Sequence, residues 1–284
     1  LYVIKKELMA NNSNIQWCDA TWNIARGCTK VDEDCKFCYM YRDSFDSTRY
    51  DPLQVVRTKT VFDLPLKIKE PSKIFTCSLT DFFYDAIDSY RNDAWDIIRK
   101  CPQHTFQILT KRPERIAEHL PDDWNENFNN VWIGTSIGSE KGIKRMYDLM
   151  DALKKKKNGG IELRKPITFI SFEPLHERID ANFDIGTLIW FDWIIIGGES
   201  GNETGKYRYR PCEIEWIDEI ANSFSSCGVA IFIKQMGTYL SKKLKMSDRH
   251  GGNINDFPKH LQIRQFPQTE KINGKNTERL RRGY

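Results

Sequence analysis

Long apolar runs are absent from this sequence. No stretch approaches about 18 consecutive apolar residues, the length that a membrane-spanning helix needs, so we expect no membrane span. The first nine residues are too short and too charged for a secretory signal. Because Met9 can serve as a natural start, residues 1–8 are expected to be an extension. We therefore expect a cytoplasmic protein that does not associate with membranes.

Histidine is scarce, and internal repeats and low-complexity tracts are absent. The five histidines show no metal-ligand spacing and are given no role; they are His104, His119, His176, His250 and His260. The formal net charge of +4 is mild and by itself decides nothing about nucleic acid. With 284 residues, 40% of them hydrophobic and 29% charged, the chain can bury a full core without disulfides.

Short apolar runs recur along the chain, each bounded by polar residues, Gly or Pro. They are rich in Ile, Val and Phe, which is typical of strands buried on both faces. The six runs are Lys73–Cys77, Thr105–Leu109, Val131–Gly134, Ile167–Ile170, Trp193–Ile196 and Val229–Ile233, and a first strand is expected at Thr21–Ala25. Segments of helical spacing lie between several of them, at Tyr90–Cys101, Ile143–Leu153 and Ile214–Phe224. This alternation predicts an α/β fold with parallel strands, either a doubly wound sheet or a (β/α) barrel.

Polar side chains follow all six apolar runs. Helix capping explains any one of them equally well, but the shared position favours one site at the carboxyl ends of the strands, as in a barrel. The residues in question are Ser78, Thr80, Asp81, Thr110, Lys111, Ser136, Glu173, Glu199 and Lys234. We therefore expect a partial or complete (β/α) barrel over residues 15–240. An N-terminal extension over 1–14 precedes it, and a polar extension over 241–284 packs on the barrel or is partly mobile.

Eight cysteines are present, and three of them fall within eleven residues. The scattered ones lie in apolar segments and are expected to be small core residues; they are Cys18, Cys77, Cys101, Cys212 and Cys227. The clustered three, Cys28, Cys35 and Cys38, lie on a loop after the first strand. Three thiolates can hold three irons of a 4Fe-4S cluster and leave the fourth iron for a small molecule.

A structural zinc site is the main alternative, with Cys18 as the fourth ligand. Structural zinc usually prefers paired Cys-x2-Cys knuckles, and one such pair exists here, Cys35 and Cys38. The third alternative is that the thiols bind no metal, but three crowded thiols would invite oxidation. An iron–sulfur site is favoured.

The segment Cys35-Lys36-Phe37-Cys38 is a Cys-x-aromatic-Cys pattern and resembles that of radical S-adenosylmethionine (SAM) enzymes. Most of that superfamily has three residues between the first two cysteines, whereas six separate Cys28 from Cys35 here, a gap that still spans a cluster. The wider chain resembles the phage Gp37/Gp68-like family, a domain of unknown function with a variant radical SAM motif, Cys-x6-Cys-x2-Cys. The matching segments lie within residues 15–270 and are Trp22–Tyr39, Ser78–Phe82, Leu109–Pro113, Ser171–Leu175, Gly197–Gly201 and Phe232–Gln235.

The resemblance implies a 4Fe-4S cluster on the three cysteines, with SAM on the fourth iron. An electron donor such as flavodoxin or ferredoxin would reduce the cluster, and cleavage of SAM would yield a 5′-deoxyadenosyl radical that abstracts a substrate hydrogen. It also implies that Phe37 packs near the adenine. Gly197-Gly198-Glu199 resembles the Gly-Gly-Glu that contacts the SAM amino group, although here it follows a late strand and a tight turn with a surface Glu explains it equally well.

Further residues are candidates for cofactor binding. Glu173 suits the SAM ammonium or the substrate, Lys111-Arg112 and Lys234 suit a carboxylate or phosphate, and Asp81 either accepts ribose hydroxyls or caps a short helix at 82–84. The full set expected to bind the cofactor is Phe37, Tyr39, Ser78, Thr80, Asp81, Thr110, Lys111, Ser136, Glu173, Gly197, Gly198, Glu199 and Lys234.

The substrate class stays open at this point. The phage association of the family and the mild positive charge favour a nucleotide or nucleic-acid base, with peptides and small metabolites as alternatives. A function of a different class is a zinc-stabilised binding protein or adaptor without catalysis. The need for a partner protein is open as well.

Overall fold

Seven parallel strands form one sheet in the computed structural model, which describes residues 13–41, 51–157, 160–203 and 208–268. The strands are β1 (Ala20–Trp22), β4 (Lys73–Thr76), β5 (Thr105–Thr110), β6 (Val131–Ser136), β9 (Ile167–Leu175), β10 (Trp193–Gly198) and β11 (Ala230–Gln235), in this spatial order. All six apolar runs predicted as strands are confirmed, and the expected first strand begins one residue earlier and is shorter. Two antiparallel pairs stand apart, β2 (Ala25–Arg26) with β3 (Val56–Arg57) and β7 (Lys156–Lys157) with β8 (Ile161–Glu162).

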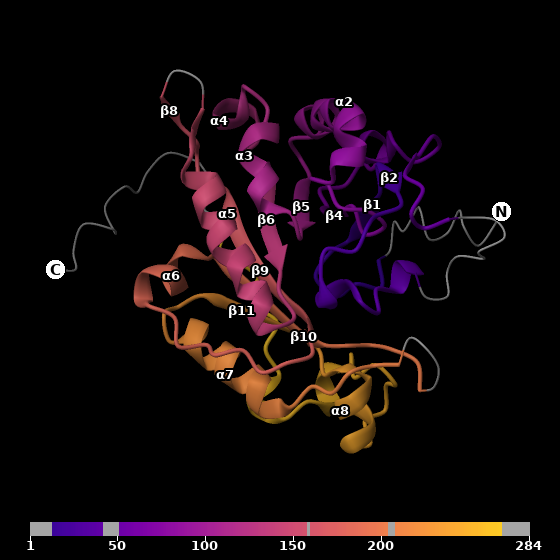
Figure 1. Ribbon diagram of the computed structural model, residues 1–284, viewed down its shortest axis with the longest axis vertical. Coiled ribbons are helices and arrows are strands. Elements are labelled where there is room, and N and C mark those ends of the chain that lie inside the picture. Colours follow the sequence, from indigo (N-terminus) through magenta and orange to yellow (C-terminus); the bar gives the residue numbers. More distant parts are fainter. Residues whose placement is uncertain (1–12, 42–50, 158–159, 204–207, 269–284) are drawn as a thin grey trace.

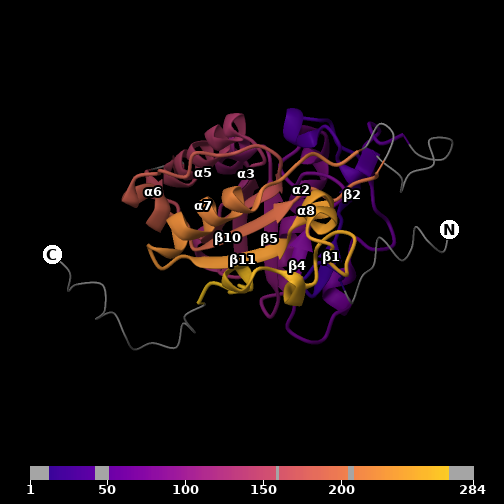
Figure 2. The same ribbon diagram turned by 90° about the horizontal axis from the view of Figure 1, so that it is seen from below.

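The strand order distinguishes the two folds that the sequence left open. A doubly wound sheet reverses its strand order at a switch point, whereas here each strand lies beside the next one along the chain. Such a sheet curls in one direction, as the half-barrel in Figures 1 and 2 shows. Since β1 and β11 form the two edges and do not pair within the described residues, the fold is a partial (β/α) barrel.

Helices pack against the sheet. They are α2 (Asp88–Lys100), α3 (Ile116–His119), α4 (Trp124–Asn127), α5 (Lys144–Lys154), α6 (Ile185–Trp190), α7 (Ile214–Ser225) and α8 (Gly237–Lys243). Of these, α5, α6 and α7 lie side by side along the sheet (Figure 1). The predicted helices correspond to α2, α5 and α7. Their apolar faces join one large core with strand residues such as Ile133, Ile170 and Ile194. Among the described residues, none of the helices combines the length and the apolar character needed to cross a membrane.

The concave face of the sheet holds a second, smaller core made largely of aromatic rings. Its buried members are Trp17, Cys18, Trp132, Phe169, Trp193, Ile195 and Phe232. The Trp193 ring meets those of Trp17 and Trp132 edge to face, with centroids 6.1 and 5.7 Å apart. Aromatic packing of this kind stabilises the fold beyond the contribution of the buried area. Side chains therefore fill part of the inside of the half-barrel.

Gly134 on β6 makes room for this aromatic core. A Cβ atom at this position would lie 2.5 Å from the ring of Phe169, its neighbour on β9. We therefore expect Gly134→Ala to lower the free energy of unfolding by about 1–3 kcal/mol, as overpacking of a core usually does. Urea denaturation measures the loss. In the double variant Gly134→Ala, Phe169→Leu the smaller side chain at 169 relieves the clash. The loss of unfolding free energy in the double variant should therefore be smaller than the sum of the losses in the two single variants.

The chain beyond α8 returns to the edge strand β11. Ile233 donates its N–H to the carbonyl of Ile263 at 2.8 Å, and Gln265 donates to the carbonyl of Ile231 at 2.8 Å. The ring of Phe266 stacks on Trp193 with centroids 5.3 Å apart. These contacts cover a strand edge that is otherwise open to pairing. The expected extensions over 1–14 and 241–284 lie partly outside the described residues.

Candidate functional site

The loop that carries the three clustered cysteines leaves the carboxyl end of β1 through the short strand β2. Gly27 has a φ of 103°, and a Cβ there would lie 2.5 Å from the carbonyl oxygen of Gln54, so this close turn requires glycine. The next N–H, that of Cys28, donates to the carbonyl of Pro52 at 3.0 Å. Backbone contacts thus fix the position of the first cysteine.

Cys28, Cys35 and Cys38 are free, partly exposed thiols. Cys35 ends a single 3-10 turn over Glu33–Cys35, and the Cys38 N–H donates to the Cys35 carbonyl at 3.3 Å. Burial is the main cause that raises the pKa of both Cys28 and Cys38, and the negative charge of Asp81 adds to it at Cys28. Across the described chain, no group of at least three His, Cys, Asp or Glu side chains is arranged to hold a metal ion. Convergence of the three sulfurs on a cluster therefore stays a prediction.

The other cysteines have structural surroundings. Cys77, Cys101 and Cys212 are buried in the main core, as expected from the sequence, and Cys227 packs partly buried against it. Cys18 lies in the concave core, where its thiol donates to the Ser13 hydroxyl at 3.3 Å. Burial raises the pKa of Cys18 to about 11.

Asp34, inside the six-residue gap between Cys28 and Cys35, anchors the cysteine loop to the half-barrel. Its side chain is fully buried. It accepts hydrogen bonds from the Gly138 N–H at 2.8 Å, the Ser139 hydroxyl at 2.8 Å and His176 Nε2 at 2.9 Å. The Arg145 guanidinium forms a salt bridge to the same carboxylate. The loops after β6 and β9 are thereby tied to the cysteine loop.

These partners decide the charge of Asp34. Burial raises the pKa of Asp34, but the hydrogen bonds from His176 and Ser139 and the charge of Arg145 outweigh it, and the net pKa lies well below the usual range. Arg145 also pairs with Asp32 and donates its Nε–H to the Ser136 carbonyl at 2.8 Å. A charged and fully partnered carboxylate of this kind fixes its loop in one position.

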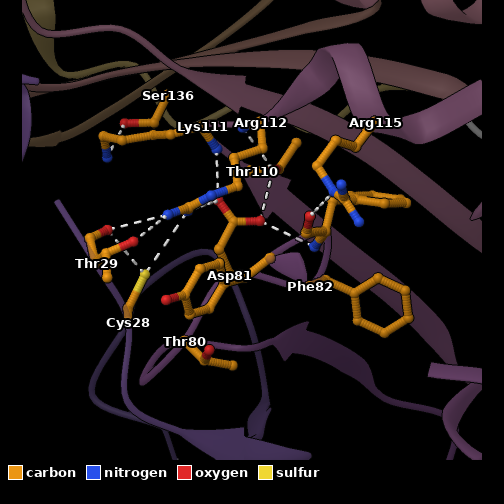
Figure 3. A network of polar contacts seen from close by, with 12 residues as sticks. Cys28, Thr29, Thr80, Asp81, Phe82, Thr110, Lys111, Arg112, Arg115 and Ser136 are labelled. Atoms are coloured by element: carbon orange, nitrogen blue, oxygen red, sulfur yellow. Dashed lines mark hydrogen bonds and ion pairs between the residues drawn. The ribbon is translucent and has the colours of Figure 1, made fainter. Parts of the chain in front are cut away.

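A second network holds the cysteine loop from the side of β4 and β5 (Figure 3). Asp81 accepts hydrogen bonds from the Thr110 hydroxyl at 2.6 Å, the Lys111 N–H at 2.8 Å and the Phe83 N–H at 3.0 Å, and its Oδ2 lies 3.2 Å from Arg112 Nη1. All these partners belong to the protein. Asp81 accepts from the Phe83 N–H and so caps a turn where the sequence predicted a short helix over 82–84. Its role as an acceptor of ribose hydroxyls stays a prediction.

A polar chain continues from Lys111 across the inside of the half-barrel. Lys111 Nζ donates to the Ser136 hydroxyl at 2.9 Å, and Ser136 donates to the Glu173 carbonyl at 2.8 Å. Glu173 pairs through its carboxylate with Lys234 on β11, and both side chains are largely buried. A Cβ on Gly197 would lie 3.4 Å from the Glu173 carboxyl carbon. Residues from β5, β6, β9, β10 and β11 therefore meet at the carboxyl edge, as the sequence predicted.

Glu199 is buried and forms an ion pair with Arg210. Its two carboxylate oxygens accept from the Arg210 guanidinium at 2.7 and 2.9 Å, and the Arg210 N–H adds a third bond. Arg210 in turn donates to the carbonyl of Glu33 at 2.9 Å and lies 5.2 Å from the Phe37 ring. Glu199 is thus not the exposed turn residue of the alternative prediction, and it holds Arg210 against the cysteine loop. Its contact with the SAM amino group stays a prediction.

The remaining candidates make contacts outside this polar chain. Ser78 bonds to the Asn23 side chain and its carbonyl accepts from the Tyr39 hydroxyl, while Thr80 donates to the Gly27 carbonyl at 2.7 Å. A Cβ on Gly198 would lie 2.3 Å from the Met236 carbonyl oxygen, so this glycine serves close backbone packing. Of the predicted residues, the structure joins Asp81, Thr110, Lys111, Ser136, Glu173 and Lys234 into one network, and Arg112 links that network to Cys28.

Several site residues were missed from the sequence. His176 received no role, and Asp34, Arg145, Arg210 and Asn23 were not singled out. The position of Asp34 within the cysteine gap was the available clue. A cavity of about 640 Å³ lies elsewhere, at the amino ends of β9 to β11, with Ile189 and Phe266 in its lining; it contains none of the predicted site residues.

Fold and site together define an α/β protein with an open parallel half-barrel and a cysteine loop fastened at its carboxyl edge. The model of a family of proteins of unknown function, DUF5131, matches residues 12–279, and the chain belongs to this family. No curated protein and no solved structure matches the chain.

Proposed function

We propose that this chain is a radical SAM enzyme in which Cys28, Cys35 and Cys38 hold a 4Fe-4S cluster. The observation that carries the proposal is the group of three free, partly exposed thiols on one loop at the carboxyl edge of a parallel half-barrel. That edge is where barrel enzymes place their chemistry. The Cys-x6-Cys-x2-Cys pattern and the resemblance to the phage Gp37/Gp68-like family support it.

The donor set suits this cofactor. Thiolates are the ligands that hold iron–sulfur clusters, and Arg112 and Lys111 place positive charge beside Cys28 and Cys38, which compensates an anionic cluster. When bound, the cluster would supply the electron that cleaves SAM. Two anchors, Asp34 and the Glu199–Arg210 pair, hold the cysteine loop against the half-barrel.

The polar chain inside the half-barrel supplies the groups that SAM requires. Glu173 suits an ammonium group, and Lys111 and Lys234 suit a carboxylate. Phe37 offers a ring for the adenine. Asp81 and Glu199 bond to arginines and backbone donors, as Glu173 pairs with Lys234, and all three stay proposed contacts of SAM. The proposed substrate is a nucleotide or nucleic-acid base, and the proposed electron donor is a flavodoxin or ferredoxin.

The zinc alternative receives less support. It requires Cys18 as the fourth ligand, but this thiol donates to Ser13 within the concave aromatic core. A tetrahedral zinc site with four cysteine ligands would need Cys18 beside the other three sulfurs. The contacts of Cys18 therefore favour the three-cysteine cluster.

Anaerobic purification and reconstitution test the proposal. A brown protein with about four irons and four sulfides per chain, the content of one such cluster, is the expected result. With dithionite it should convert SAM into 5′-deoxyadenosine and methionine. A colourless protein that contains stoichiometric zinc and does not cleave SAM would contradict the proposal.

A further inference from the structure

Arg112 is held by contacts on several sides (Figure 3). Nη1 lies 3.2 Å from Asp81 Oδ2, and Nη2 donates to the carbonyl and hydroxyl oxygens of Thr29 at 3.0 and 3.1 Å. The guanidinium carbon lies 4.5 Å from the centre of the Tyr84 ring. The side chain is 11% exposed. These contacts fix the direction in which the guanidinium points.

The guanidinium points at Cys28. Nη1 lies 3.7 Å from Cys28 Sγ, within hydrogen-bonding reach of a sulfur acceptor. Arginine keeps its charge at every pH at which the protein is folded. Because the Arg112 side chain is nearly buried, water screens its charge less than it screens the charge of the exposed Lys36 in the cysteine loop. The Arg112 charge therefore acts directly on the Cys28 sulfur, and it offsets the negative charge of Asp81, which pairs with the same nitrogen.

We infer that Arg112 is a positioning residue that holds Cys28 in place and raises the reduction potential of the cluster bound there. The inference rests on the proposed function. Reduction transfers one electron from an external one-electron donor to the cluster, whose net charge becomes more negative by one. Charges and hydrogen bonds at the ligating sulfurs set the potential of such clusters. A cation beside Cys28 therefore stabilises the reduced cluster more than the oxidised one.

The matched control is Arg115, the next arginine along the chain. It donates to the Phe83 carbonyl at 2.8 Å and pairs with Asp88, and none of its recorded bonds reaches a cysteine. Arg112→Gln removes the charge and Arg112→Lys keeps it without the planar fork. Each variant is reconstituted as the full chain, its iron is quantified, and its cluster is titrated with dithionite under mediators and followed by electron paramagnetic resonance.

In Arg112→Gln the ratio of reduced to oxidised cluster at a fixed potential should fall about tenfold, the size expected for loss of a hydrogen bond to a charged group. This corresponds to a midpoint about 59 mV lower for one electron. Arg112→Lys should show a smaller fall, and Arg115→Gln should match the wild type. If Arg112→Gln loses its iron, Arg112→Lys is used in its place. A midpoint potential or an iron content of Arg112→Lys below that of Arg115→Gln supports the inference.

Two outcomes overturn the inference, and they are distinguishable. A wild-type chain that forms no cluster overturns the proposed function and the inference with it. A normal wild-type cluster, with Arg112 variants equal to Arg115→Gln in iron content and midpoint, overturns the inference alone.

Discussion

Replacing any one of Cys28, Cys35 and Cys38 by alanine is expected to abolish the iron–sulfur spectrum of the reconstituted protein. A cluster that leaves one iron open for SAM has three protein ligands, and loss of one leaves two thiolates with no replacement. None of the recorded hydrogen bonds brings a fourth cysteine into this loop, and the fully buried Cys77 lies in the main core. Iron content and visible absorption of each single variant should therefore equal those of the triple alanine variant.

Two other cysteines are the controls. Cys227 is also partly exposed but lies after α7, and Cys18 is buried in the concave core. Cys227→Ala and Cys18→Ser should both keep the cluster and SAM cleavage. Full iron content in any single variant of the three loop cysteines would contradict the assignment, and loss of metal from Cys18→Ser together with zinc in the wild type would favour a zinc site.

The strands were predictable because their apolar runs are long enough to stand out, but their carboxyl ends were not. The prediction ended two runs at Ile170 and Ile233, before Ser171 and Lys234, whereas β9 continues to Leu175 and β11 to Gln235. At these ends Glu173 of β9 and Lys234 of β11 pair with each other, so polar residues continue the strands. Part of the predicted site therefore belongs to the strands themselves rather than to the loops after them.

The sequence predicts which residues lie at the carboxyl ends of the strands, but it does not predict which side chains pair with one another there. Asp81 and Glu199 were candidates either for a ligand contact or for a local turn, and each bonds to an arginine further along the chain, Arg112 or Arg210. Such pairs leave no local pattern, since each partner is simply one charged residue among many. The bond between Asp34 and His176 joins residues 142 positions apart, and the tertiary fold alone defines it.

The six-residue gap between Cys28 and Cys35 departs from the usual three, and Asp34 gives it a physical role. We expect Asp34→Ala to lower the free energy of unfolding by about 3–5 kcal/mol, the usual cost of breaking a buried ion pair from one side. The Arg145 guanidinium would remain buried with Asp32 as its carboxylate partner, and the donors of Gly138 and Ser139 would lose their acceptor. Urea denaturation of the chain without metal measures this loss.

Glu33 supplies the matched control, since it precedes Asp34 in the same loop. Its side chain is 69% exposed and forms an ion pair with the exposed Lys36, and such pairs contribute little. Glu33→Ala also leaves the main-chain carbonyl that Arg210 uses. It should therefore change stability by less than about 1 kcal/mol. A double variant tests the cost of leaving Arg145 without Asp34. Asp34→Ala combined with Arg145→Met should be more stable than Asp34→Ala alone, because removing both members of a buried ion pair costs less than removing one. If Asp34→Ala is as stable as Glu33→Ala, the carboxylate does not anchor the loop, and the longer gap between the cysteines has another cause.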